Sequence, residues 1–106
     1  MALAGFLHAD VEPGQSAPDF TLPNCEGKQT SLSDFKGKVV VLEWINPGCP
    51  FVKKHYGSGN MQKLQKEAAD KGVVWISISS SAPGKQGHLA AADVAKSCAE
   101  NGSQAT

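Results

Sequence analysis

The chain has 106 residues, with 10 basic and 10 acidic side chains that leave no formal net charge, and 41% of its residues are hydrophobic. This length suits one small domain around one core. The balanced charge argues against a nucleic-acid-binding protein, which usually carries a basic excess. The longest apolar run, Val39–Leu42, is too short to cross a membrane.

The N-terminal segment differs from the rest of the chain. Met1–Ala9, MALAGFLHA, looks like the end of a secretory signal, although it has no basic start and only a short apolar core. We therefore expect residues 1–10 to be a signal-peptide remnant or a disordered terminus, followed by a domain over residues 11–106. Periplasmic or secreted residence depends on this segment alone, and a cytoplasmic protein is expected otherwise.

Two short strands open the predicted domain, at residues 20–22 and 29–32. Gly27 lies between them and supplies the turn of a hairpin. A single helical turn is predicted over residues 33–38. The next strand, at residues 39–45, is mostly β-branched and apolar, which is typical of a central strand buried on both faces.

The second half of the chain alternates helix and strand. Asn46-Pro47-Gly48 ends the strand, and helices are predicted over residues 49–56 and 61–71, the second capped by Asn60. The apolar stripe of this second helix is predicted to face the core and consists of Met61, Leu64 and Ala68. The remaining elements are a strand, a polar loop and a helix, at residues 73–78, 79–87 and 88–101.

The order of these elements is hairpin, strand, helix, strand, helix, which predicts an α/β fold. A strand–helix–strand unit implies two parallel strands joined by a right-handed crossover. Such strands need neighbours and helices on both faces, yet the sequence ends soon after the last predicted helix. We therefore expect a domain truncated before its last strands. Its exposed strand edges could pair with a second copy in a homodimer.

Cys49 is the main candidate for chemistry. It is predicted at a strand-to-helix junction, directly before Pro50, and proline is favoured at the first position of a helix. The unpaired N–H groups and partial positive charge of a helix N-terminus stabilise an anion, and the thiolate is the nucleophilic form of cysteine. The alternative is a buried, inert cysteine, which the surrounding prolines and glycine argue against.

Three segments resemble one protein family. Lys38–Val52, KVVVLEWINPGCPFV, is similar to the active-site region of thioredoxin-fold proteins. Ala17–Leu22, APDFTL, and Leu32–Lys38, LSDFKGK, resemble the start of the redoxin branch, the alkyl hydroperoxide reductase/thiol-specific antioxidant (AhpC/TSA) family. The resemblance runs from about Val11 to the end of the chain. It implies a thioredoxin-like fold with a peroxiredoxin-type N-terminal hairpin.

The resemblance also implies a thiol-dependent redox protein, either a peroxidase or a thiol-disulfide oxidoreductase. Cys49 matches the nucleophile, next to Pro50 in the same motif. Glu43 matches the acid that assists proton transfer, with a water-facing strand residue as the alternative, and Trp44 is expected in the core. The substrate would be a peroxide or a disulfide, and an external thiol would restore Cys49. No cofactor, metal, nucleic acid or membrane is implied.

The chain departs from the family at several points. Thioredoxins carry a CxxC motif, but Val52 occupies its second cysteine position. Asn46 stands where peroxiredoxins carry a threonine, and the chain has none of the arginine that peroxiredoxins use. These differences favour the alternative function, a non-catalytic thioredoxin-fold binding or interaction module.

The other candidate residues carry weaker signals. Cys98, on the last predicted helix, is a candidate resolving thiol, although its apolar stripe favours core packing. Cys25, at the hairpin turn, is a second candidate and is expected to be exposed. His55 lies six residues after Cys49, so the two do not share a helix face. The loop Ala82–Gly87 lacks the spacing of a phosphate-binding loop and is predicted to be a plain loop.

Overall fold

The structure is a computed structural model that describes residues 11–105. Residues 1–10, and with them the predicted signal remnant, lie outside the described residues. Within the described part of the chain, no helix has the length and apolar character needed to cross a membrane.

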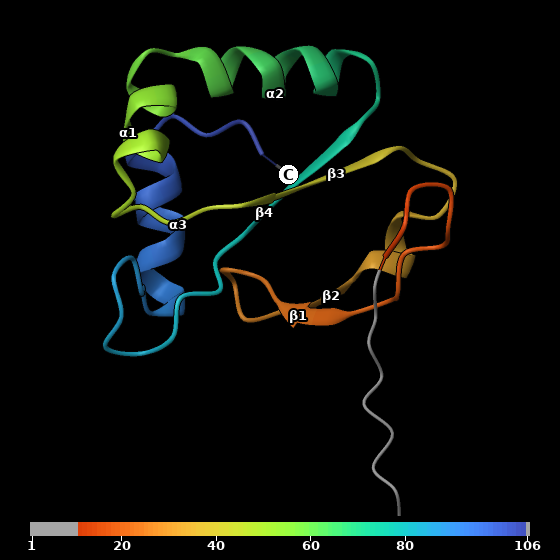
Figure 1. Ribbon diagram of the computed structural model, residues 1–106, viewed down its shortest axis with the longest axis horizontal. Helices are drawn as coiled ribbons and strands as arrows, with labels where there is room; N and C mark the ends of the chain where they lie inside the picture. The colour runs from red at the N-terminus through yellow and green to blue at the C-terminus, as the bar shows by residue number, and fades with distance from the viewer. Residues whose placement is uncertain (1–10, 106) are drawn as a thin grey trace, which may run out of the picture.

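The described chain begins with the expected hairpin. Strands β1 (Thr21–Pro23) and β2 (Gln29–Ser31) pair in antiparallel fashion. Gly27, in the turn between them, has a φ of 78°, which glycine adopts without steric cost. A short 3-10 turn, η1 (Leu32–Phe35), leads from the hairpin to the central strands. Figure 1 shows the hairpin at the bottom of the molecule.

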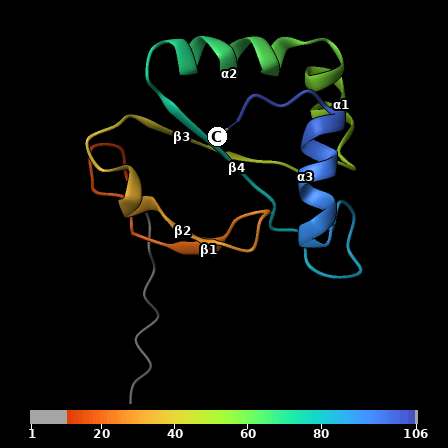
Figure 2. The same cartoon turned by 180° about the vertical axis from the view of Figure 1, so that it is seen from behind.

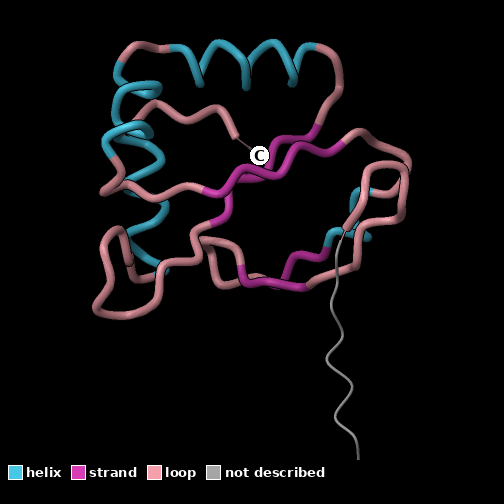
Figure 3. The backbone as a smooth tube through the Cα atoms, viewed as in Figure 1, coloured by secondary structure: helices cyan, strands magenta, loops and turns pink. Residues whose placement is uncertain are grey.

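Two parallel strands form the centre of the molecule. β3 (Val40–Trp44) pairs with β4 (Val74–Ile78), and Glu43 lies opposite Ser77 in this register. They cross the middle of the molecule side by side (Figure 3). Two helices connect them, so the predicted parallel strand–helix–strand unit is confirmed.

The connecting helices meet at a corner (Figure 1). They are α1 (Pro50–Gly57) and α2 (Asn60–Asp70). The predicted Asn60 cap is wrong by one residue, because Gly59 is the N-cap and has a φ of 77°. A left-handed backbone at the corner requires glycine. Asn60 is instead the first helical residue, and its side-chain nitrogen lies 3.4 Å from Nδ1 of His55.

The last helix, α3 (Ala91–Glu100), lies at the same end of the sheet as α1, in front of it when the molecule is seen from behind (Figure 2). It begins three residues later than predicted. The Nδ1 atom of His88 lies 2.8 Å from the carbonyl oxygen of Ser81, which holds His88 in the preceding loop. The segment after α3 returns along α2, where Gln62 donates a hydrogen bond to the carbonyl of Asn101 at 2.6 Å.

Few side chains of the described residues are buried. Tyr56 and Val74 are each 7% exposed, and Gln65 is completely buried. The prediction that Leu64 faces the core is wrong, since Leu64 is 42% exposed. Gln65 takes the inward position because its amide donates to the Tyr56 hydroxyl at 2.9 Å and accepts from the Gln104 N–H at 2.8 Å.

Strand β3 is not buried on both faces, contrary to the prediction. Side chains alternate along a strand, and Glu43 points towards α1 and α2. Its neighbour Trp44 therefore points to the opposite face. Trp44 is 62% exposed there, so no described element covers it and its predicted core packing is wrong.

Candidate active site

Cys49 is the N-cap of α1. It has an extended backbone (φ −74°, ψ 127°) directly before Pro50, the first residue of the helix. Its N–H donates to the carbonyl of Asn46 at 2.9 Å, and its own carbonyl accepts from the N–H of Lys53 at 3.0 Å. The thiol is half-buried. The backbone thus holds Cys49 at the junction between the end of β3 and the start of a helix.

The first turn of α1 leaves two backbone N–H groups open. Pro50 has no N–H, and the N–H groups of Phe51 and Val52 have no acceptor among the described residues. Phe51 is 71% exposed, so this end of the helix is open to solvent. Open N–H groups and the helix dipole favour negative charge. This arrangement can stabilise a thiolate on Cys49 or an anion on a reacting molecule.

Asn46 joins the loop before Cys49 to the loop after β4. Its Oδ1 accepts from the N–H of Gly48 at 2.8 Å, and its Nδ2 donates to the carbonyl of Gln86 at 3.2 Å. Nε2 of Gln86 donates in return to the carbonyl of Gly48 at 3.2 Å. We call these contacts the Asn46–Gln86 bridge. The predicted plain loop Ala82–Gly87 therefore contacts the candidate site, and nothing in the sequence distinguishes Gln86 from other loop amides.

Glu43 lies on the face of β3 that α1 and α2 cover. Its carboxylate accepts from the Tyr56 hydroxyl at 3.1 and 3.0 Å, from Trp75 Nε1 at 2.8 Å and from Ser77 Oγ at 3.0 Å. Glu43 is half-buried, so the water-facing alternative does not describe it. Within the described residues, no hydrogen bond joins Glu43 to the Cys49 thiol.

The Glu43 carboxylate also affects its main partner. Burial raises the pKa of the Tyr56 hydroxyl above its ordinary value, and the negative charge of Glu43 raises it further. Glu43 is a predicted site residue, whereas Tyr56 and Gln65, which both contact its carboxylate, are not. Nothing in the sequence shows that an aromatic side chain on α1 and an amide side chain on α2 converge on one residue of β3.

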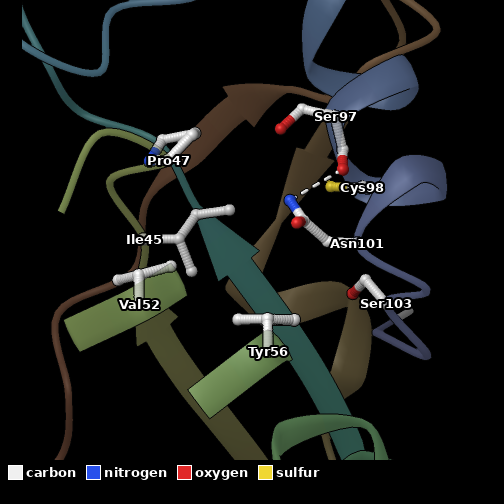
Figure 4. Close-up of a pocket in the computed structure, with 8 residues that line it drawn as sticks. All are labelled: Ile45, Pro47, Val52, Tyr56, Ser97, Cys98, Asn101 and Ser103. Atoms are coloured by element: carbon white, nitrogen blue, oxygen red, sulfur yellow. Dashed lines mark hydrogen bonds between the residues drawn. The ribbon is translucent and has the colours of Figure 1, made fainter. Parts of the chain in front are cut away.

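Cys98 faces a small, mainly apolar hollow between α1, α3 and the end of β3 (Figure 4). Val52, at the second position of the thioredoxin-type motif, lines the same hollow. Burial raises the pKa of the Cys98 thiol, and electrostatic interactions with Cys25 and Glu43 add to this effect. All three cysteines are free thiols, and Cys25 is exposed, as predicted.

The structure brings only some of the candidate residues together. Cys49, Pro50 and Asn46 lie within one loop and one helical turn, whereas Glu43 is directed to the face beneath α1 and α2. His55 is exposed and contacts Asn60. Among residues 11–105, no group of three or more His, Cys, Asp and Glu side chains could hold a metal ion.

Comparison with known proteins gives the class of protein. The model of the AhpC/TSA family matches residues 13–100, so the chain belongs to the AhpC/TSA family. The crystal structure of the thioredoxin domain of thiol-disulfide oxidoreductase BVU-2223 from Bacteroides vulgatus superposes with a TM-score of 0.64. That match has 27% identity and covers 88% of this chain and 60% of the other. The predicted family and thioredoxin-like fold are therefore confirmed.

Two relatives share a higher sequence identity with the chain than this solved structure does. The chain is 41% identical over 71 residues to thioredoxin-like protein YneN of Bacillus subtilis, covering 66% of this chain and 41% of that protein. It is 47% identical over 47 residues to chloroplastic peroxiredoxin Q of Populus jackii, covering 41% of this chain and 22% of that protein. The chain thus spans less than half the length of either relative.

Proposed function

We propose that the chain is a thiol-dependent oxidoreductase in which Cys49 is the nucleophile. The observation that carries this proposal is the position of Cys49 at the N-cap of α1, beside the open N–H groups of Phe51 and Val52. Relatives named as a peroxiredoxin and as a thiol-disulfide oxidoreductase support the same class.

The oxidant in this proposal is a peroxide or a disulfide. The Cys49 thiolate attacks one peroxide oxygen, the O–O bond breaks, and Cys49 becomes a sulfenic acid while the leaving oxygen takes a proton. An external thiol then condenses with the sulfenic acid, giving a mixed disulfide and water. A second external thiol releases the Cys49 thiol and leaves as a disulfide. With a disulfide substrate, the thiolate forms the mixed disulfide directly and expels a thiolate.

The reductant is external in this scheme because neither position 52 nor Cys98 supplies a suitable resolving thiol. Val52 removes the neighbouring thiol of a CxxC motif. The raised pKa of Cys98 keeps it in the thiol form, which is the weak nucleophile. Replacing Cys98 or Cys25 by serine should leave turnover unchanged. A peptide map showing a disulfide from Cys49 to Cys98 or Cys25 after a peroxide pulse would instead assign that cysteine as the resolving thiol.

Turnover tests the proposal. The reduced chain is mixed with hydrogen peroxide, or with a small-molecule disulfide, and excess small-molecule thiol, and thiol consumption is followed. We expect Cys49→Ser to abolish turnover and the matched variant Cys25→Ser to retain it. If wild-type turnover does not exceed the uncatalysed rate, or if Cys49→Ser matches wild type, the enzyme proposal fails. A non-catalytic thioredoxin-fold binding or interaction module then becomes the better description.

The proton-transfer role that the resemblance implies for Glu43 is a second part of the proposal. Glu43→Gln keeps the shape of the side chain and one acceptor oxygen but cannot ionise. We expect it to change the pH dependence of turnover. If the pH profile matches that of wild type, Glu43 has a structural role only.

The proposal also covers the oligomeric state of the protein and its cellular compartment. β3 and β4 each have one edge without a strand partner among the described residues, which supports a homodimer formed by strand pairing. A monomer mass in light scattering of the full chain would overturn it.

Periplasmic or secreted residence depends on Met1–Ala9, and recovery of the expressed protein in the cytoplasmic fraction would contradict it.

A further inference from the structure

We infer that Gln86 is a positioning residue for Cys49, acting through the peptide groups of Gly48. The inference rests on the proposed role of Cys49 as the nucleophile. It concerns a residue 38 positions after Gly48 in the sequence, on the loop that follows β4.

The geometry of the Asn46–Gln86 bridge encloses Gly48 from two sides. The side chain of Asn46 accepts from the Gly48 N–H at 2.8 Å, and the side chain of Gln86 donates to the Gly48 carbonyl at 3.2 Å. Asn46 also donates to the backbone of Gln86 at 3.2 Å. Both backbone polar groups of the residue before Cys49 are therefore engaged by these two side chains.

The close fit at Gly48 shows that the bridge is packed as well as hydrogen-bonded. A Cβ on Gly48 would lie 2.7 Å from Cγ of Gln86 and 3.2 Å from Oδ1 of Asn46. Only glycine lets the two side chains approach the backbone this closely. Glycine has no side chain to restrict its backbone dihedral angles. The Asn46–Gln86 bridge restrains the backbone of Gly48 instead.

The restraint on Gly48 bears directly on Cys49. The carbonyl that Gln86 holds belongs to the peptide group that carries the Cys49 N–H, and this N–H donates to Asn46 at 2.9 Å. Fixing this peptide plane keeps the backbone of Cys49 in the N-cap position of α1. Without the Gln86 donor, the peptide can rotate, and Cys49 spends part of its time outside the N-cap position.

The test compares Gln86→Met, which keeps the length of the side chain but removes the donor, with Ser80→Ala in the same loop. The Ser80 side chain makes no hydrogen bond within the described part of the chain. The rate of iodoacetamide alkylation at Cys49 is measured against pH by peptide mapping of the full chain. We expect Gln86→Met to slow alkylation at pH 7 by about threefold to tenfold, since one hydrogen bond is lost. The midpoint of its rate–pH profile should rise.

Gln86→Glu is the second variant, because it also removes the donor and should be at least as slow as Gln86→Met. Circular dichroism should match wild type for both, and the midpoint of thermal unfolding should fall by only the few degrees that one lost hydrogen bond accounts for, while Ser80→Ala should match wild type throughout. If both Gln86 variants give the wild-type rate–pH profile while wild-type Cys49 reacts faster than Cys25, the positioning role is overturned and the proposed function stands. If wild-type Cys49 reacts no faster than Cys25, the proposed nucleophile and this inference both fail.

Discussion

The Tyr56 hydroxyl lies within hydrogen-bond distance of both carboxylate oxygens of Glu43, at 3.1 and 3.0 Å. Ser77 and Trp75 donate to the same carboxylate from β4, and Gln65 donates from α2 at 3.4 Å. One acidic side chain therefore joins the parallel strand pair to the helix that Cys49 caps. The stability of the candidate site should depend on this cluster.

Tyr56→Phe removes the hydroxyl that donates to Glu43 and accepts from Gln65. Because a hydrogen bond to a charged group contributes about 1.5–3 kcal/mol, we expect the free energy of unfolding to fall by roughly that amount in urea denaturation. Combined with Glu43→Gln, the two effects should couple by more than about 0.5 kcal/mol, as contacting residues do. Fully additive effects would show that the contact contributes nothing.

Alkaline pH should weaken the fold through Tyr56. The pKa of its hydroxyl is raised above the ordinary value of 10.0, first by burial and then by the charge of Glu43. The folded chain thus holds this proton more tightly than the unfolded chain. The contribution of the protonated Tyr56 hydroxyl to the free energy of unfolding is fully present below pH 10.0 and is lost as the pH rises through the folded-state pKa. Wild type should therefore lose more stability above this pH than Tyr56→Phe, and equal losses would refute the assignment.

Gly87 and Gly84 form a matched pair for testing the loop after β4. Both have a positive φ, 76° and 77°, so alanine is strained at either position. A Cβ at residue 87 would collide with the side chain of Asn46, whereas a Cβ at residue 84 meets nothing within 4 Å. We expect Gly87→Ala to cost about 1–3 kcal/mol more than Gly84→Ala in thermal or urea unfolding, and to alter Cys49 alkylation. Equal costs would mean that the loop does not pack on Asn46.

Of the two cysteines outside the candidate site, Cys98 should be alkylated more slowly than Cys25. Burial raises the pKa of its thiol, whereas Cys25 is exposed. At pH 7 we expect Cys98 to be alkylated more slowly than Cys25 in the folded chain and at a similar rate in denaturant. Similar rates under native conditions would show that the hollow beside Val52 is open to solvent.

The strand–helix–strand unit and the place of Cys49 within it could be predicted from local signals. The apolar run before Asn46 and the proline after Cys49 act over a few residues, and such signals determine where a strand ends and a helix begins. The hairpin turn at Gly27 is a signal of the same kind.

The contacts around the site could not be predicted in this way. Gln86 reaches Gly48 across 38 residues, and no periodic pattern marks an amide that makes such a contact. In α2, apolar character favoured Leu64 as the core residue, but Gln65 is buried because its amide has partners in Tyr56 and Gln104. Exposure of Trp44 depends on what covers one face of β3, which is a tertiary property.

Site-resolved oxidation shows directly which cysteine is the nucleophile. The reduced full chain receives a brief pulse of hydrogen peroxide or, in a parallel sample, of a small-molecule disulfide, is quenched with an alkylating reagent, and is digested for mass spectrometry. We expect one added oxygen on Cys49 after peroxide, or a mixed disulfide at Cys49 after the disulfide or when a small thiol is present, with Cys25 and Cys98 recovered as alkylated thiols. Oxidation of Cys25 or Cys98 ahead of Cys49, or a Cys49 that neither oxidant modifies, would contradict the assignment of Cys49 as the nucleophile.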